Sequence, residues 1–164
     1  MSDIEKDSEI NRDNLISEHQ NYEQISPYQK SEIYSQDDSI DLNISKELID
    51  ELLERLSVFE KELHYLKSGI TVQNLAKDYG TNVKYLSKVV NYYKGKPFIH
   101  YVNDLRIEYA VLKLKEDKLY RQFTIEALSK EFGFHSKDSF TTAFHKKTGL
   151  KPLFFIQQLV TQNI

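Results

Sequence analysis

The 164-residue sequence contains no cysteine, which excludes a disulfide framework, a thiolate metal site and a cysteine nucleophile. Glycine is also scarce, and its five occurrences form no phosphate-cradling pattern. The histidines show neither an i, i+4 pair nor a nearby carboxylate at metal-site spacing; they are His19, His64, His100, His135 and His145. We therefore predict no catalytic site, no metal and no cofactor.

Long apolar runs are absent as well. No segment approaches the roughly 20 apolar residues that a membrane-spanning helix needs. The first ten residues lack the basic and apolar regions of a signal peptide. We expect a soluble protein, and the lack of cysteine fits the reducing cytoplasm.

Positive charge is nearly missing from the first part of the chain. Residues 1–45 contain eleven acidic and three basic residues, a net charge of −8. Residues 67–164 contain sixteen basic and eight acidic residues, a net charge of +8. The overall net charge of −3 therefore conceals a basic module behind an acidic segment, and a basic module is typical of nucleic-acid-binding proteins.

The acidic segment and the residues after it have different periodicity. Residues 1–43 are polar with isolated apolar residues, so we predict a mostly disordered tail or linker. Three tyrosines recur there at six-residue spacing, either by chance or as a docking segment for a partner. Residues 44–68 have the period of one amphipathic helix, capped by Ser45 and ended at Ser68-Gly69, that packs on the following domain. Its apolar face would consist of Leu48, Leu52, Leu56, Phe59, Leu63 and Leu66.

The remaining residues, 69–164, divide into short helices between glycine turns. We predict a helix-turn-helix unit at 71–94, a long helix at 97–116, a second unit at 124–148 and a final helix at 152–160. The long helix would present one apolar side with Phe98, Val102, Leu105, Tyr109 and Leu112. No strand-like alternation competes, so the predicted class is all-α.

The two units repeat each other. Thr71–Gly80 aligns with Thr124–Gly133 at an offset of 53 residues, and the later glycine and proline of each copy also correspond. In each copy the apolar residues of the first helix can pack on those of the second. Ala76 and Ser129 are small enough for the helices to cross closely, and a glycine ends each first helix. This arrangement is typical of helix-turn-helix motifs that read DNA.

From about residue 70 to residue 159 the sequence resembles the AraC/XylS-type DNA-binding domain. The second copy carries most of the resemblance, through Leu128-Ser129, Phe132-Gly133-Phe134, Ser136, Phe140, Phe144, Gly149, Pro152 and Phe155. The resemblance implies two helix-turn-helix units joined by one long helix, with the second helix of each unit in successive major grooves. Because such grooves lie roughly 34 Å apart on one DNA face, a single chain could read a pair of sites without dimerising. Domains of this family usually follow a sensing domain, which implies a fragment of a longer bacterial regulator.

The same resemblance implies which side chains read bases. They are Lys84, Tyr85, Ser87 and Lys88 in the first copy and Lys137, Asp138, Thr141 and Thr142 in the second. Lys84 and Lys88 share one helix face and suit guanine edges or phosphates, with an ordinary solvated face as the alternative. Many family members carry arginine where Thr142 stands, and threonine cannot bind guanine through two hydrogen bonds. We therefore expect more sequence discrimination from the first copy. Asp138 either favours the helix dipole or accepts a hydrogen bond from cytosine.

Phosphate contacts are expected from helix N-termini and from basic side chains. The candidates are Asn82, Arg106, His135, Ser136, Lys146 and Lys147. Arg106 could instead form a salt bridge within the fold, with Glu108, Asp104 or another acidic residue as its partner.

Two functions remain open at this point. The first is a sequence-specific double-stranded DNA-binding transcription regulator, favoured by the basic module and by Lys84 and Lys88. The second is a helical protein-interaction module that keeps the scaffold without reading DNA, favoured by Thr142 and the acidic tail. RNA polymerase and an upstream sensing domain are further candidate partners, and we expect no membrane contact from this chain itself.

Overall fold

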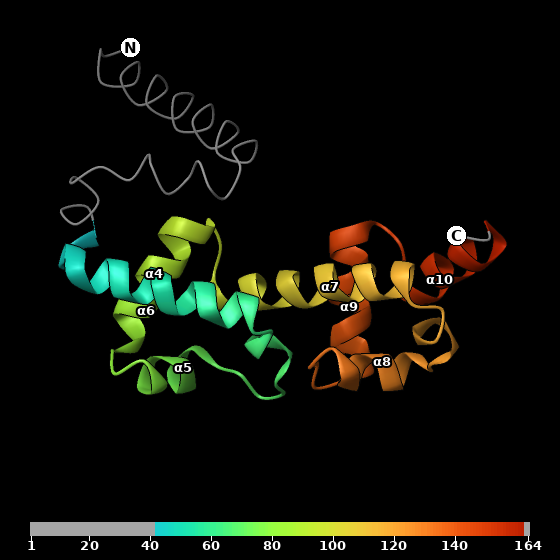
Figure 1. Cartoon of the computed structure of the whole chain (residues 1–164), viewed down its shortest axis with the longest axis horizontal. Coiled ribbons are helices and arrows are strands. Elements are labelled where there is room, and N and C mark those ends of the chain that lie inside the picture. The colour runs from blue at the N-terminus through green and yellow to red at the C-terminus, as the bar shows by residue number, and fades with distance from the viewer. Residues whose placement is uncertain (1–41, 163–164) are drawn as a thin grey trace, which may run out of the picture. The chain divides into compact units, whose positions relative to one another are not determined.

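The computed structural model describes residues 42–162, and every regular element in this part of the chain is helical (Figure 1). The α-helices are α4 (Lys46–Lys61), α5 (Val72–Asp78), α6 (Val83–Lys94), α7 (Phe98–Glu116), α8 (Ile125–Glu131), α9 (Lys137–Thr148) and α10 (Pro152–Thr161). Two 3-10 helices, η1 (His64–Leu66) and η2 (Tyr120–Gln122), lie before α5 and before α8. The all-α class is confirmed. The prediction of a disordered acidic tail lies outside the described residues.

Helix α4 is shorter than predicted. It begins at Ser45, whose hydroxyl accepts a hydrogen bond from the Leu48 N–H at 3.4 Å, and it ends at Lys61 instead of continuing to residue 68. Leu63 adopts a left-handed conformation with φ of 57°, and the chain turns there into η1. The apolar period of the sequence continues through Leu63 and Leu66 because apolar side chains of the turn also pack inside the molecule. Leu66 packs against a different core from the one that α4 covers.

Two helix pairs form the repeated units, which we call the first unit (α5 and α6) and the second unit (α8 and α9). Each of the four helices begins at the predicted cap, where a side-chain oxygen accepts a backbone N–H three residues later. The caps are Thr71, Asn82, Thr124 and Ser136. The turns also match, because the N–H of Thr81 donates to the Ala76 carbonyl at 2.9 Å and the N–H of Phe134 donates to the Ser129 carbonyl at 2.8 Å. These are the hydrogen bonds of a Schellman ending, with a left-handed glycine between the helices of each unit.

Helix α7 connects the units, which lie at its opposite ends in Figure 1. Its buried residues do not form the single side that was predicted. Phe98, Tyr101 and Val102 are buried in its first half, and Ile107, Ala110 and Leu114 are buried in the core of the second unit. Leu112, which was placed on the predicted apolar side, is 47% exposed. The prediction was wrong because the two ends of α7 pack against different units, on different sides of the helix.

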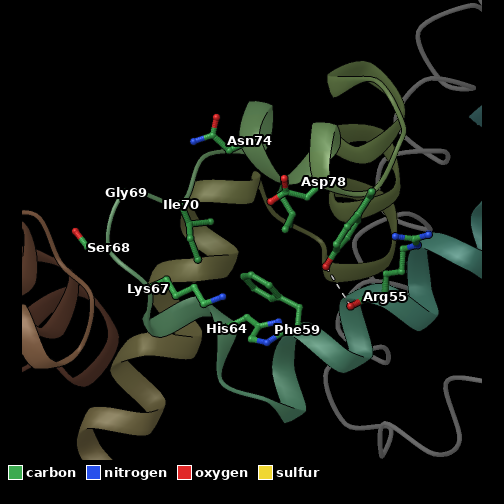
Figure 2. A pocket seen from close by; sticks show the side chains of 11 residues that line it. Arg55, Phe59, His64, Lys67, Ser68, Gly69, Ile70, Asn74 and Asp78 are labelled. Carbon is green, nitrogen blue, oxygen red and sulfur yellow. Dashed lines mark hydrogen bonds between the residues drawn. The ribbon is translucent and has the colours of Figure 1, made fainter.

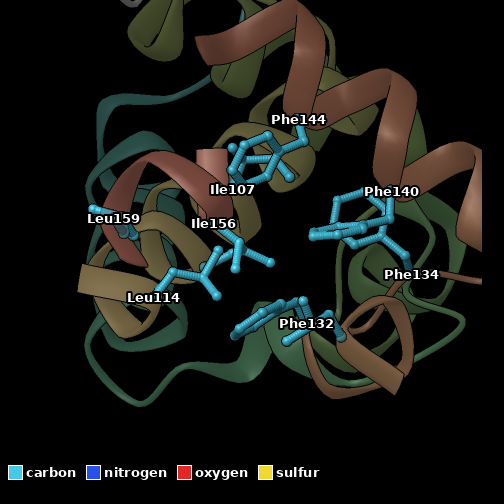
Figure 3. Close-up of a cluster of buried hydrophobic side chains, with 10 residues drawn as sticks. Ile107, Leu114, Phe132, Phe134, Phe140, Phe144, Ile156 and Leu159 are labelled. Atoms are coloured by element: carbon cyan, nitrogen blue, oxygen red, sulfur yellow. The ribbon is translucent and has the colours of Figure 1, made fainter. Parts of the chain in front are cut away.

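Aromatic rings dominate the core of the second unit (Figure 3). Phe140 lies between Phe132 and Phe134, with ring centroids 6.1 and 5.3 Å away, and Phe144 continues the cluster at 5.6 Å from Phe140. Offset and edge-to-face pairs of this kind add to the stability that apolar burial provides. Helix α10 begins at Pro152 in its first turn, as predicted, and contributes two further residues to this core, Ile156 and Leu159.

Candidate DNA interface

The exposed side of α6 carries positive charge on Lys84, together with the exposed Val83 and Tyr92. Its opposite side belongs to the core of the first unit through Leu86, Val89 and Val90. Of the predicted base-reading residues, Lys84 is exposed, whereas Tyr85, Ser87 and Lys88 are half-buried. Lys88 also has an interaction within the protein. Lys84 is therefore the most accessible cation among the candidates on this helix.

The exposed side of α9 is polar but less basic. Its buried residues are Phe140 and Phe144. Lys137, Asp138 and Thr142 are exposed and Thr141 is half-buried. These candidates lie outside the core, as those of α6 do, and the two sets lie at opposite ends of α7 (Figure 1).

Both helices begin in a way that leaves backbone donors open to an anion. The Asn82 side chain accepts the Tyr85 N–H at 2.9 Å, and the Ser136 hydroxyl accepts the Ser139 N–H at 3.2 Å. A helix has four N–H groups without a helical partner in its first turn, and a cap satisfies only one or two of them. The remaining groups, together with the helix dipole, favour a phosphate. His135 is exposed directly before the cap of α9.

Arg106 does not fit the predicted phosphate contact. Its side chain is only 5% exposed, and its guanidinium donates to the carbonyl oxygens of Tyr65 at 2.6 Å and Lys67 at 2.8 Å. Burial lowers the pKa of this guanidinium to about 10. The alternative, a salt bridge with Asp104 or Glu108, is also wrong, because the hydrogen-bond partners of Arg106 are backbone carbonyls.

Asp104 and Glu108 of α7 bind lysines instead. Glu108 lies 2.8 Å from the ammonium of Lys147, and Asp104 lies 2.7 Å from Lys96 and 3.9 Å from Lys147. Lys147 therefore connects the end of α9 with α7, in addition to any phosphate contact. Lys146 is exposed beside it.

A family model described as "Helix-turn-helix domain" matches residues 75–158, which is just over half of the chain. This range begins within α5 and covers the rest of the first unit, α7 and the whole second unit. The chain belongs to the AraC-type helix-turn-helix family. Membership in this family supports DNA-binding transcription regulation as its role.

Several solved structures have the same fold. One is the C-terminal domain of AraT, a response regulator from Geobacillus stearothermophilus, with a TM-score of 0.57 and 23% identity over 66% of this chain and 84% of that chain. Another is the DNA-binding domain of AdpA in complex with a target DNA, with a TM-score of 0.58 and 15% identity over 68% and 95%. A third is the C-terminal domain of the response regulator YesN from Fusobacterium nucleatum, with a TM-score of 0.51 and 25% identity over 68% and 96%.

No curated protein sequence matches this AraC-type chain. Within residues 42–162, no helix has the length and apolar character needed to cross a membrane. No group of three histidine, aspartate or glutamate side chains gathers there as it would to bind a metal.

A cleft of about 440 Å³ lies beside the first unit of this AraC-type domain, between α4, the chain around η1 and α5 (Figure 2). Its lining combines apolar residues such as Phe59 with charged ones. Two of the lining side chains have acidic partners, since Arg55 lies 2.8 Å from Glu51 and the His64 imidazole lies 3.4 Å from Glu62. The cleft therefore offers a mixed surface without a set of residues recognisable as a catalytic or cofactor site.

Sequence reasoning missed the residues that connect the units. Tyr65, Lys67 and Gly133 meet around Arg106, and no local pattern assigns them to one another. The one available signal was Arg106 itself, since a cation among the apolar residues of a helix that joins two units requires partners when it is buried.

Proposed function

We propose that the chain is a sequence-specific transcription regulator that reads double-stranded DNA with α6 and α9 in successive major grooves. The observation that carries the proposal is the repeated geometry. Two capped helices of 12 residues each, with one side buried and the other exposed, lie at opposite ends of one connecting helix. Two major grooves on the same face of DNA repeat after about 34 Å, so a pair of helices on one chain suits them.

Affinity comes mainly from phosphate contacts in this proposal. The basic stretch from residue 67 onward, with its net charge of +8, provides the positive charge. The open N–H groups at the starts of α6 and α9 and the exposed Lys146 would contact phosphates and fix the register of each helix. Binding should therefore weaken steeply with salt, because each neutralised phosphate releases counterions.

Discrimination between bases comes mainly from α6. Lys84 and Lys88 can donate to the O6 and N7 acceptors of guanine, and a good contact is worth roughly 1–3 kcal/mol. Thr141 and Thr142 on α9 provide smaller polar and methyl contacts. The second unit would therefore contribute more to position and affinity than to sequence preference.

The similar structures support this choice of partner. The AdpA domain has this fold and is in complex with a target DNA. The AraT and YesN domains are C-terminal parts of response regulators, which supports a longer regulator in which a sensing domain controls this chain. RNA polymerase is the further partner that a transcription activator would contact. The family also supports a non-enzymatic function.

The test is a selection of binding sites from random double-stranded DNA at two salt concentrations. We expect enrichment of two short motifs about one helical turn apart, with retention falling at the higher salt. A chain carrying Lys84→Ala and Lys88→Ala should lose one motif. The matched control carries Lys46→Ala and Lys61→Ala, which remove the same charge from α4, outside both units, and should keep both motifs. No enrichment from a folded chain would contradict the proposal.

A protein-interaction module remains the second candidate, and one surface feature favours it. Helix α10 exposes three apolar side chains, Leu153, Phe154 and Val160. An apolar interface depends weakly on salt, so salt-insensitive binding of a protein partner, without enrichment of DNA sites, would favour this function.

A further inference from the structure

The η1 turn precedes the first unit in sequence but packs against the second. Leu66 is half-buried against the aromatic core of the second unit. Its carbonyl group lies against Gly133, so closely that a methyl group added at Gly133 would come within 2.8 Å of the Leu66 carbonyl carbon. The turn therefore packs directly against the loop between α8 and α9.

Arg106 holds the turn in this place. Its guanidinium donates to the carbonyl oxygens on both sides of Leu66, from Nε to Tyr65 and from Nη2 to Lys67. The same guanidinium lies 5.4 Å from the ring centroid of Phe134, the residue that follows Gly133. One side chain of α7 thus contacts both the turn and the second unit.

Aromatic contacts extend this connection. The Tyr65 ring meets Tyr109 of α7 edge to face at 6.4 Å, and Tyr109 meets Phe132 of the second unit at 6.2 Å. Tyr65 also packs at 6.2 Å against Phe59, the last buried residue of α4. A continuous line of rings therefore runs from α4 to the second unit.

Helix α4 is also attached to the first unit. Glu60 lies 2.8 Å from the ammonium of Lys94 at the end of α6. The Tyr79 hydroxyl at the end of α5 donates to the Arg55 carbonyl at 3.1 Å. Residues 45–67 consequently form a second connection between the units, in addition to α7. They lie outside the matched range of the family model.

We infer that Arg106 is a positioning residue, which clamps the η1 turn between the units and thereby fixes α9 relative to α6 and sets the separation of the two DNA half-sites. The inference rests on the proposed function. Long helices bend, so α7 alone leaves the separation of its ends variable, whereas two parallel connections do not. Arginine suits the position because its planar fork can donate to two carbonyls at once in a fixed geometry.

The test compares Arg106→Lys with Arg121→Lys. The control is closely matched, because the Arg121 guanidinium also donates to two carbonyls, of Leu114 and Lys115, at 2.7 Å each, but these lie at the end of α7 itself. Affinity is measured for each selected half-site, for the paired site, and for paired sites with one to five base pairs inserted or removed. We expect Arg106→Lys to bind half-sites within about twofold of the unmodified chain and the paired site about tenfold more weakly, with a flattened dependence on spacing. Arg121→Lys should keep the sharp dependence.

Leu66→Ala provides a second variant, since it removes the apolar contact of the turn but leaves Arg106 in place. We expect the same flattened spacing dependence from it. A dependence that stays sharp in both variants overturns the inference. A loss that is equal for half-sites and paired sites also overturns it, because it assigns Arg106 to folding alone.

A measurement without DNA separates this inference from the proposed function. The chain lacks cysteine, so Asn91→Cys on α6 and His145→Cys on α9, both at exposed positions, permit specific spin labelling. The distance distribution between the labels should be narrow and should broaden with Arg106→Lys but not with Arg121→Lys. If the unmodified chain binds no paired site, the proposed function fails while this measurement still decides the clamp. An unchanged distribution overturns the clamp.

Discussion

The first unit combines apolar packing with partly buried polar contacts to α4 and α7, whereas the second is packed around a cluster of aromatic rings. In the first, the Tyr101 hydroxyl of α7 donates to the Glu60 carboxylate at 2.7 Å, and the same carboxylate binds the ammonium of Lys94. In the second, the rings of Phe132, Phe140 and Phe144 lie together in the core. The same backbone frame, with the same caps and the same Schellman turn, is thus stabilised by two kinds of interaction.

The difference shows what the helix-turn-helix frame requires and what it leaves free. Small residues are needed where the helices cross, and both Ala76 and Ser129 are buried. The residues that fill the remaining space can differ, because apolar burial is not directional. The first unit should consequently respond to pH through its ionisable groups, and the second should respond mainly to loss of side-chain volume.

The largest expected difference comes from truncating corresponding core residues. Phe144→Ala should lower the free energy of unfolding by roughly 3–5 kcal/mol, because it leaves a cavity in the aromatic core. Val90→Ala, at the equivalent position of α6, removes about two methylene equivalents and should cost roughly 2 kcal/mol. Both residues are fully buried, so exposure does not explain the difference. Urea unfolding measures it, and equal losses would contradict the contrast between the cores.

The turn glycines sharpen the comparison. Gly80 and Gly133 both have positive φ, so alanine at either should cost roughly 1–2 kcal/mol. Space is open around Gly80, but the Leu66 carbonyl lies against Gly133, which should add roughly 1–3 kcal/mol. Thermal and urea unfolding of the two alanine variants should therefore rank Gly133→Ala as the more damaging. A larger effect from Gly80→Ala would show that η1 does not pack against the second unit.

Alkaline pH should act on the first unit through Tyr101. Burial and the neighbouring Glu60 raise the pKa of Tyr101 above its usual value near 10. The folded chain therefore keeps a proton that the unfolded chain loses above pH 10, so the stabilisation is complete below pH 10 and falls as pH rises, by up to about 1.4 kcal/mol per pH unit. Tyr101→Phe, which has no such proton, should be less stable by roughly 1–3 kcal/mol at pH 7.

The stability difference between the unmodified chain and Tyr101→Phe should then shrink between pH 10 and pH 11. Arg106, whose pKa is lowered by burial, titrates in both proteins and does not contribute to the difference. A pH-independent difference in urea unfolding would contradict the assignment of Tyr101.

The smallest effects are expected from the exposed ion pairs with α7. Asp104 contacts Lys96, which follows the first unit, and Lys147 of the second. Partly exposed pairs contribute about 0–1 kcal/mol. Lys96→Ala and Lys147→Ala should each lower the free energy of unfolding by less than about 1 kcal/mol, and less in 1 M than in 0.05 M salt. A loss of several kcal/mol from either variant would contradict the view that these ion pairs contribute little to holding α7 against that unit.

The elements that the sequence predicts well depend on near neighbours. Thr71, Asn82, Thr124 and Ser136 cap their helices through groups three residues away, and the glycine stops act within one turn. The predicted exposure of Lys84, Lys137 and Thr142 agrees with the structure because the amphipathic period places them opposite the core. Their contacts with DNA remain predictions.

The features that the sequence did not predict depend on distant residues. Arg106 reaches carbonyls 41 and 39 residues away, and periodicity carries no information about such a pairing. The end of α4 was misplaced for a related reason, since Leu63 and Leu66 keep the helical apolar period while the chain turns toward the second unit. The buried side of α7 changes along its length, so one amphipathic pattern could not describe it.

The central claim is that one chain reads DNA with both units. Its most direct test is a binding titration with the selected paired site and with two altered sites, in each of which one half is replaced by unrelated sequence. Each replacement should weaken binding by at least about tenfold, and replacing the half read by α6 should have the larger effect. The chain carrying Lys84→Ala and Lys88→Ala identifies the half read by α6. Once that half has been replaced, the two substitutions should no longer lower the affinity. If replacing one of the halves leaves the affinity unchanged, only one unit reads DNA and the claim is wrong.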